Sequence, residues 1–532
     1  MFMFDNTKPN IILLTDHTDN QIMTKSVGTY RVATELRKAG FQVAVLNHLS
    51  MFTVDELKHI ITNMISDHTL FVGINNFFYA DLSKVSYKDG IFWVPADQGT
   101  FLPHGKHFNK EIKQLIKTAN PNCKIVLGGP NATDHVYTND FDFVVAGYAE
   151  ISIVNLAKHL LNPSVTLEKS YKSIHGPVIV NDSKAEGFDF VESDTVYHND
   201  DVVLPGETLV LEIARGCIFS CAFCSYPLNG KKKLDYIRSK ERIRDELMRN
   251  YQKFRVTRYI FSDDTFNDSP EKCQMIYEIS KTLPFKLEWW AYLRLDLLRA
   301  HPQTIEWLIE GGLRSAFFGI ETLHPQAGTA IGKGGGRDQL FSVVQQIKEK
   351  YGNLVSLHGS FIFGLPHEDI DSMKKTGDFL LSDQNPLDTW NIQPLTIRPS
   401  NKTYSNDFLS DIDKNFSKYG YEDCGADFFS SQPKNMFAKH PNGFMMWKNQ
   451  YTDWHAVEEL SAAFNIGRTA KQNAKLLGIR AFGLAGLGLS LDKFLNKEIK
   501  SINWDDTKTA KNYRIVQYKK KIFEQFSIPR IC

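Results

Sequence analysis

Short apolar runs alternate with amphipathic helical segments along most of this 532-residue chain, and this alternation limits the fold more than any other feature. The amino-terminal part holds five candidate strands, at residues 10–16, 41–46, 70–74, 124–127 and 143–146. Helices are predicted at residues 24–39 and behind a capping box formed by Thr53 and Glu56. Strands that alternate with helices predict a doubly wound parallel sheet, whose ligands bind beyond the carboxyl ends of the strands. We therefore predict a Rossmann-like domain over residues 1–162.

A second series of alternating runs begins at residue 208 and predicts another α/β domain, over residues 208–400. Its six candidate strands are residues 208–214, 258–262, 287–292, 315–320, 355–363 and 390–397. The helices predicted between them are residues 239–254, 270–282, 302–310, 338–350 and 369–381.

The other regions have weaker patterns. Residues 163–207 are polar, lack long periodicity and carry several prolines and glycines, which indicates a linker. Residues 401–532 are predicted to be mainly helical, with helices at 451–464 and 471–477. The chain shows no internal repeat or low-complexity tract.

Three of the seven cysteines lie close together, directly after the candidate strand at residues 208–214. Cys217, Cys221 and Cys224 have the spacing C-x-x-x-C-x-x-C. Three thiolates can hold three irons of a 4Fe–4S cluster, and the fourth iron would then be open to a substrate or cofactor. The alternatives are a zinc site or buried free thiols. Zinc usually takes four ligands in two pairs, and the other four cysteines are scattered singly.

This motif, with Phe223 just before the third cysteine, resembles that of the radical S-adenosylmethionine (radical SAM) superfamily. The resemblance extends over roughly residues 10–400 and rests on the order of the later segments as much as on the cysteines. It implies that the open iron chelates the amino and carboxylate groups of SAM, and that the reduced cluster cleaves SAM to a 5′-deoxyadenosyl radical. It also implies that the six βα units form a partial (β/α)6, TIM-like barrel, with every strand end around one cavity.

The same resemblance implies which residues contact SAM. Arg294 would neutralise the carboxylate of SAM by a forked contact, and Glu321 would accept hydrogen bonds from the ribose hydroxyls. The full set of implied SAM contacts is Phe223, Asp263, Arg294, Glu321, Gly364 and Pro366. Each segment also has a simpler interpretation. Asp264, beside Asp263, can cap a helix, an arginine at a strand end is often a salt-bridge partner, and residues 364–366 fit a strand-to-helix turn.

The amino-terminal domain resembles the cobalamin-binding domain that precedes many radical SAM domains, at residues 27–45, 128–130 and 144–150. The resemblance implies cobalamin contacts at Asp16, Gly28, Asn75, Gly128, Gly129 and Gly147. The D-x-H-x-x-G motif that supplies a histidine to cobalt is absent, because Asp67-His68 and Asp134-His135 do not have its spacing. Radical SAM relatives often lack this motif and still bind cobalamin. Tight turns need glycine anyway, so a domain that has lost the cofactor is the alternative. Residues 80–103 form an aromatic-containing insertion to which we assign no role.

The composition predicts a soluble, cytoplasmic protein. The formal net charge of +1 gives no reason to expect a partner such as extended nucleic acid. No apolar run approaches the ~20 residues of a membrane helix, and the amino terminus lacks a signal-peptide pattern. The cysteines form no disulfide framework, which fits a reducing compartment.

The predicted function is that of a cobalamin-dependent radical SAM C-methyltransferase, acting on an unactivated carbon. The resemblance implies an electron donor such as flavodoxin or ferredoxin as a partner. One alternative is a radical SAM rearrangement, cyclisation or epimerisation enzyme whose cobalamin-like domain is empty or structural. Another is a non-enzymatic metal-binding scaffold. A peptide, a nucleobase, a sugar or a lipid all remain open as the substrate.

Overall fold

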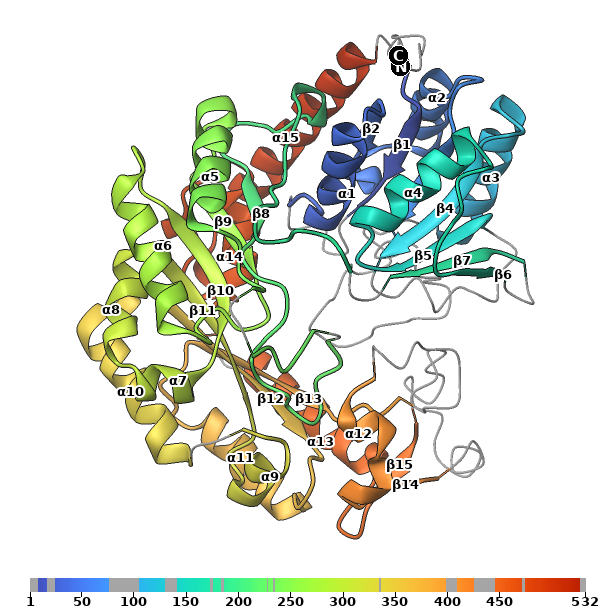
Figure 1. Cartoon of the computed structure of the whole chain (residues 1–532). Helices are drawn as coiled ribbons and strands as arrows, with labels where there is room; N and C mark the ends of the chain where they lie inside the picture. The colour runs from blue at the N-terminus through green and yellow to red at the C-terminus, as the bar shows by residue number, and fades with distance from the viewer. Residues whose placement is uncertain are drawn as a thin grey trace.

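The protein is an α/β structure with two largely parallel sheets and a helical carboxyl-terminal region (Figure 1). The computed structural model describes residues 8–16, 24–75, 105–129, 141–172, 176–182, 186–226, 228–232, 235–333, 336–398, 409–424, 445–470 and 474–526. Among these residues, no helix combines the length and the apolar character needed to span a bilayer. The fold predicted from the sequence is confirmed.

The first sheet has seven strands in the order β2-β1-β3-β4-β5-β7-β6, all parallel except β6. Its strands are β1 (Ile11–Leu14), β2 (Val43–Leu46), β3 (Phe71–Asn75), β4 (Lys124–Gly129), β5 (Phe143–Gly147), β6 (Ser170–Lys172) and β7 (Val178–Asp182). The first five are the predicted ones. The predicted linker at residues 163–207 is not wholly irregular, because it contributes β6 and β7. Only three consecutive apolar residues mark β7 in the sequence, so pairing with β5 defines it more than local pattern does.

Helices cover both faces of this sheet. Residues Ile11 and Leu13 of β1 pack toward α1 (Val27–Lys38) and α4 (Glu150–Leu161). The alternate residues, Ile12 and Leu14, pack toward α2 (Val54–Met64) and α3 (Gly105–Ala119). The period-2 alternation thus buries each strand on both faces, as a parallel sheet between helices requires. The capping box of Thr53 and Glu56 is formed at the start of α2, as predicted.

The second sheet has six parallel strands in sequential order, as in an open (β/α)6 barrel. The strands are β8 (Thr208–Glu212), β9 (Arg258–Ser262), β10 (Glu288–Leu293), β11 (Leu313–Glu321), β12 (Ser356–Phe363) and β13 (Thr389–Pro394). The helices are α5 (Lys240–Phe254), α6 (Pro270–Thr282), α7 (Leu295–Ala300), α8 (Gln303–Glu310), α9 (Pro325–Ala330), α10 (Arg337–Tyr351) and α11 (Ile370–Leu381). Figure 1 shows α6, α8 and α10 along the outer side of this sheet. All five helices and six strands predicted here are confirmed to within a few residues.

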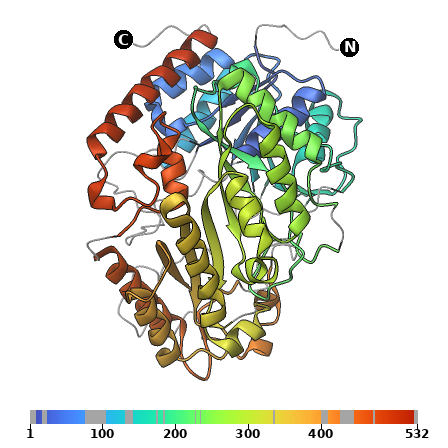
Figure 2. The ribbon, with the colours of Figure 1, turned by 90° about the vertical axis from the view of Figure 1, so that its left-hand side faces the viewer.

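The carboxyl-terminal region returns to both sheets. Its elements are α12 (Asp411–Lys414), β14 (Glu422–Asp423), β15 (Trp447–Lys448), α13 (Trp454–Ala470), α14 (Gly478–Ala485) and α15 (Trp504–Gln525). Helix α13 packs on β13, and α14 contacts five strands of the barrel, β8 to β12. Helix α15 reaches the first domain (Figure 2). There the Tyr518 hydroxyl donates to the carbonyl of Asn47 at 3.0 Å.

The predicted helix at residues 471–477 is wrong where the structure describes it. Residues 474–477 are not helical, and the helix begins at Gly478. The glycines in and around α14 lower its intrinsic helix propensity, but its buried face packs into the barrel and stabilises it. The sequence prediction also missed α15, whose charged sequence gives only a weak apolar stripe.

Two glycine substitutions in this region are expected to shift stability in opposite directions. In Gly478→Ala, the new Cβ would lie 2.7 Å from the Cβ of Ser315 on β11, so α14 must move, at a cost of about 1–3 kcal/mol. In Gly467→Ala, inside α13, the nearest atom would be at 3.5 Å, so the higher helix propensity of alanine should stabilise by about 0.5–1 kcal/mol. Thermal unfolding of both variants checks this. A Gly478→Ala protein as stable as the wild type would show that α14 is not packed as described.

Candidate functional site

The loop that follows β8 carries the three cysteines and is folded tightly on itself. Gly216 has a φ of +96°, and a Cβ at this position would lie 2.1 Å from the carbonyl oxygen of Leu228. Only glycine fits such a position. The next residue, Cys217, forms two backbone hydrogen bonds within the loop. Its N–H donates to the carbonyl of Leu228 at 3.3 Å, and its carbonyl accepts from the N–H of Lys231 at 3.0 Å. We call residues 213–232 the cysteine loop.

Each cysteine sulfur in the loop has a polar neighbour from the surrounding structure. The Cys217 thiol donates to the Thr265 hydroxyl (3.4 Å), and the guanidinium of Arg294 donates to the Cys221 sulfur (3.5 Å). The Asn229 amide donates to the Cys224 sulfur at 3.0 Å. N–H donors of this kind stabilise thiolates and tune iron–sulfur clusters.

The donor set fits a 4Fe–4S cluster. The three thiols are free, Cys217 is buried, and Cys221 and Cys224 are partly exposed. Burial raises the pKa of the Cys217 thiol to about 11, so binding of iron must displace its proton. No three metal-binding side chains are gathered around one point within the described ranges, so the sulfurs must turn toward a cluster as it binds. Thiols alone, without carboxylate or imidazole, suit iron–sulfur chemistry.

Arg294 lies against the cysteine loop, as the sequence predicted, but already has a carboxylate partner. Its guanidinium stacks on the Phe219 ring, with 3.9 Å to the ring centroid. Two of its nitrogens donate to Asp296 at 3.0 and 2.6 Å in a forked pair. The salt-bridge interpretation is therefore what this structure shows, and contact with SAM stays a prediction.

The two carboxylates of the acidic segment after β9, Asp263 and Asp264, lie in different surroundings. Asp263 is buried in an ion pair with Lys272 (2.9 Å), which is itself fully buried and also pairs with Asp268. Asp264 instead accepts from the backbone N–H of Gly216 at 3.1 Å, beside the first cysteine. Burial raises the pKa of Asp264 to about 7. The predicted SAM contact of Asp263 is untested, and Asp264 is the carboxylate that lies on the cysteine loop.

Glu321 ends β11 in a strained conformation. Its φ of +68° is rare for a side chain larger than glycine, and the register shifts between Gly319 and Glu321. Lys333 approaches its carboxylate at 3.5 Å and donates to the Gly319 carbonyl at 2.7 Å. A Cβ on Gly319 would lie 2.5 Å from the Glu321 carboxylate. The local backbone thus holds this buried carboxylate at the carboxyl end of the barrel. Its partner Lys333 also lies near the cysteine loop, with its ammonium 6.0 Å from the centroid of the Phe223 ring.

The segment that carries Gly364 and Pro366, two of the predicted SAM contacts, is a tight turn after β12. Gly364 has a φ of +84°, and a Cβ there would lie 2.6 Å from the Trp447 ring. The buried carboxylate of Glu368 accepts from the N–H groups of Gly364 (3.0 Å) and Leu365 (3.1 Å). These bonds fix Gly364 and Pro366 at the barrel mouth, and their contact with SAM stays a prediction.

The buried Glu368 carboxyl should make folding stability depend on pH. Burial raises its pKa from 4.5 to about 7, so the folded chain holds this proton to a higher pH than the unfolded chain. The resulting stabilisation is complete below pH 4.5 and is lost as the pH rises toward 7. Glu368→Gln should therefore lose less stability than the wild type between these pH values, as measured by thermal unfolding. An unchanged pH profile would contradict the assignment.

The predicted cobalamin contacts meet at the carboxyl edge of the first sheet. Asn75 ends β3, and its amide donates to Ser26 (3.0 Å) and Thr29 (3.1 Å) at the start of α1. In a sheet of order 2-1-3, the gap between β1 and β3 is the switch point at which such folds bind ligands. The structure places all six predicted residues, Asp16, Gly28, Asn75, Gly128, Gly129 and Gly147, at or beside this edge.

This edge has features that fit a large polar cofactor. A Cβ added at Gly28 would meet no atom of the described residues within 4 Å, so those residues leave space beside α1. The hydroxyls of Thr15 and Ser152 are buried and lack a partner among the described residues, so a ligand at this edge could satisfy them. His68 precedes β3 and lies at the opposite edge. The insertion at residues 80–103 and the Asp134-His135 pair lie outside the described residues.

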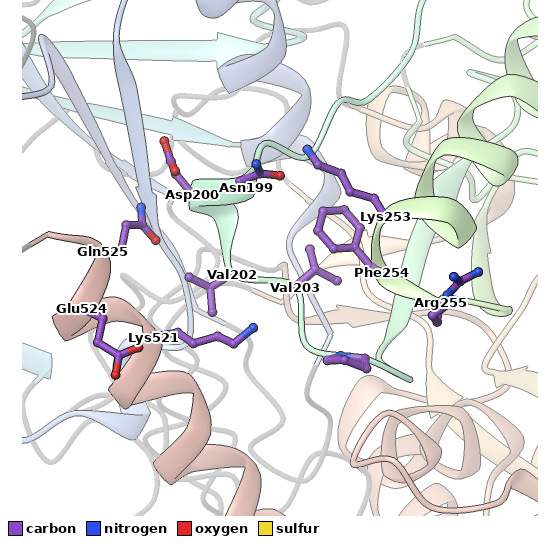
Figure 3. A pocket seen from close by; sticks show the side chains of 11 residues that line it. Asn199, Asp200, Val202, Val203, Lys253, Phe254, Arg255, Lys521, Glu524 and Gln525 are labelled. Atoms are coloured by element: carbon purple, nitrogen blue, oxygen red, sulfur yellow. The ribbon is translucent and has the colours of Figure 1, made fainter.

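A cavity of about 590 Å³ lies away from the carboxyl ends of the strands in both sheets (Figure 3). It is lined by residues that precede β8, by the end of α5 and by the last turn of α15. These segments lie at the amino ends of the barrel strands. Its lining includes the basic residues Lys253 and Lys521 and the acidic residues Asp200 and Glu524. This cavity contains no part of the cysteine loop and is not where the predicted chemistry occurs.

An open parallel barrel with three cysteines after its first strand is the arrangement of radical SAM domains. Residues 211–380 match the radical SAM superfamily, and the chain therefore contains a domain of this family. Such a domain implies a 4Fe–4S cluster and SAM.

One curated relative is an uncharacterized methyltransferase of Pyrococcus horikoshii, with 29% identity over 292 residues. The match covers 50% of this chain and 60% of that protein, so the chain spans about 60% of the length of the relative.

Solved structures of similar fold extend over nearly the whole chain. The radical SAM methyltransferase TsrM from Kitasatospora setae, solved with cobalamin and a 4Fe–4S cluster bound, has a TM-score of 0.61 at 14% identity, covering 97% of this chain and 99% of that one. The cobalamin-dependent SAM radical enzyme OxsB, solved with aqua-cobalamin and SAM bound, has a TM-score of 0.57 at 15% identity, covering 97% and 72%. These similarities confirm the fold of the first domain and of the barrel together.

Proposed function

We propose that this protein is a cobalamin-dependent radical SAM methyltransferase that methylates an unactivated carbon. The observation that carries the proposal is a contact between the carboxyl edge of the first sheet and the cysteine loop. Tyr148 follows β5 at the carboxyl edge of the first sheet, and its ring lies 4.4 Å from the guanidinium of Arg215, two residues before Cys217. A cofactor at the first edge would therefore lie opposite the mouth of the barrel, with the substrate between them.

The similarity to TsrM and OxsB supports this arrangement, since both of those structures contain cobalamin and share the fold of the two domains. The relative from Pyrococcus horikoshii, described as a methyltransferase, supports the reaction class. When bound, the cluster with SAM would supply the hydrogen-abstracting radical and cobalamin would supply the methyl group.

The residues of this chain would bind and orient these groups. Cys217, Cys221 and Cys224 would hold the cluster, and the donors from Asn229 and Arg294 would stabilise their thiolates. Glu321 would hold the ribose of SAM by accepting two hydrogen bonds. Helix α14 fills the barrel below these residues and excludes water from that end. The reaction also requires an electron donor, for which flavodoxin and ferredoxin are the expected classes.

The test measures two products of SAM after production with hydroxocobalamin and purification without oxygen. The enzyme is incubated with titanium(III) citrate and SAM, and S-adenosylhomocysteine and 5′-deoxyadenosine are quantified by mass spectrometry. We expect both products, with S-adenosylhomocysteine absent from enzyme produced without cobalamin. Release of 5′-deoxyadenosine alone from the cobalamin-supplied enzyme would favour a radical rearrangement, cyclisation or epimerisation. Release of neither product would favour a non-enzymatic scaffold.

A further inference from the structure

We propose that a buried chain of four charged side chains holds the cysteine loop in register with the first domain. The chain, which we call the ion chain, runs Arg31–Glu212–Arg215–Glu150. Its two ends belong to the first domain and its two centre residues belong to the barrel. The part of the inference that concerns cofactor geometry rests on the proposed function, but the mechanical coupling does not.

The contacts of the ion chain are continuous. On α1, Arg31 donates to the Glu212 carboxylate at 2.9 Å. Glu212 is the last residue of β8, and it also accepts two bonds from Arg215, at 2.6 and 3.0 Å. Arg215 then donates to Glu150, the first residue of α4. The four charges sum to zero, and each end of the chain has its ionic partner in the barrel, so Arg31 and Glu150 are paired only when both domains are in contact.

All four side chains are largely removed from water. Their exposed fractions are 1% for Arg31, 13% for Glu212, 8% for Arg215 and 3% for Glu150. A buried ion left without its partner is strongly unfavourable, so each link depends on the next. Burial opposes ionisation of Glu212, but the neighbouring guanidinium groups of Arg215 and Arg31 hold its pKa at about 2.

The centre of the ion chain is adapted to arginine in particular. The guanidinium of Arg215 lies 4.4 Å from the Tyr148 ring and 4.7 Å from the Phe190 ring. A planar guanidinium can stack on rings and form a forked pair with a carboxylate at the same time, whereas an ammonium cannot. Tyr148 lies at the carboxyl edge of the first sheet, where the cobalamin contacts are predicted. This packing therefore joins that edge directly to the start of the cysteine loop.

The position of the ion chain distinguishes it from other contacts between the same parts. Arg37, also on α1, forms a buried forked pair with Asp201 at 2.7 and 2.8 Å. Tyr518 of α15 binds the first domain at Asn47. Both contacts hold α1 or the first sheet without touching the cysteine loop. The contacts of Arg215, in contrast, connect the first domain to a residue two positions before Cys217, so loss of the ion chain should loosen the loop itself.

The test uses Arg31→Gln and Glu150→Gln, because neither residue lies in the cysteine loop. Hydrogen–deuterium exchange of the full-length protein, purified without oxygen, is measured by mass spectrometry on peptides from residues 213–226. We expect exchange in these peptides to rise by about tenfold or more in both variants. The matched control is Arg37→Gln, which breaks an equally buried pair on the same helix and should leave these peptides within about twofold of wild type. Arg31→Lys keeps the charge and should restore most of the protection.

Three outcomes would overturn the inference. One is unchanged exchange at residues 213–226 in both variants, and another is an equal rise in Arg37→Gln. If Arg31→Gln or Glu150→Gln does not fold, the comparison is made with Glu150→Asp, whose shorter side chain draws the carboxylate away from Arg215, and wild-type exchange in that variant again overturns it. A second measurement, the ratio of S-adenosylhomocysteine to 5′-deoxyadenosine, should change in the uncoupled variants. If the wild type forms no S-adenosylhomocysteine, the proposed function fails while the exchange result still decides the coupling.

Discussion

Replacing any one of Cys217, Cys221 or Cys224 by alanine should lower the formation of 5′-deoxyadenosine by about a thousandfold or more, as loss of an essential catalytic group commonly does. Each cysteine supplies one of three iron ligands, and the described structure has no fourth thiol beside them to substitute. The measurement is the rate of 5′-deoxyadenosine release from SAM under titanium(III) citrate, together with iron content.

The control for these variants is Cys424→Ala. Cys424 is also a free, partly exposed thiol, but it lies in the carboxyl-terminal region after β14 and outside the cysteine loop. This variant should retain iron and wild-type rates. Release of 5′-deoxyadenosine at the wild-type rate by a Cys217→Ala protein would contradict the assignment of the cluster to this loop.

The second large effect is expected from Gly216→Ala. Alanine at a φ of +96° is strained, and its Cβ would lie 2.1 Å from the Leu228 carbonyl and 2.9 Å from the Leu228 Cβ. Because one of these atoms belongs to the backbone, the cysteine loop must open. Iron content should fall to about a tenth of the wild-type value or less, since all three ligands are displaced together.

Gly336→Ala is the matched control for this substitution. Gly336 precedes α10, and a Cβ there would meet no atom within 4 Å. That variant should bind iron normally. If Gly216→Ala also binds iron normally, the loop does not have the conformation described here.

Much of the fold could be predicted because its elements are marked locally. The barrel strands and helices follow clear apolar periods with caps, such as Ser269 and Pro270 at the start of α6. The elements that were missed or misplaced depend on distant contacts. Strand β7 is defined by its pairing with β5, and α14 by burial inside the barrel.

The candidate site also contains features that the local sequence marks and features that depend on distant contacts. The cysteine triplet was readable because three thiols at short spacing have few other interpretations. The sequence did not show which of Asp263 and Asp264 lies on the cysteine loop, because adjacent residues at a strand end point in different directions. Nor did it show that Lys333 meets Glu321, or that Arg31 meets Glu212, because these partners come from separate elements.

The measurement that tests the central claim most directly is the iron and cobalt content per chain. The protein is produced with hydroxocobalamin available, purified without oxygen and analysed by elemental mass spectrometry. The proposal predicts about four irons and one cobalt per chain, the content of one 4Fe–4S cluster and one cobalamin. Iron without cobalt would contradict the methyltransferase assignment and leave the radical chemistry standing. Zinc, or no metal at all, would contradict the whole account of the cysteine loop.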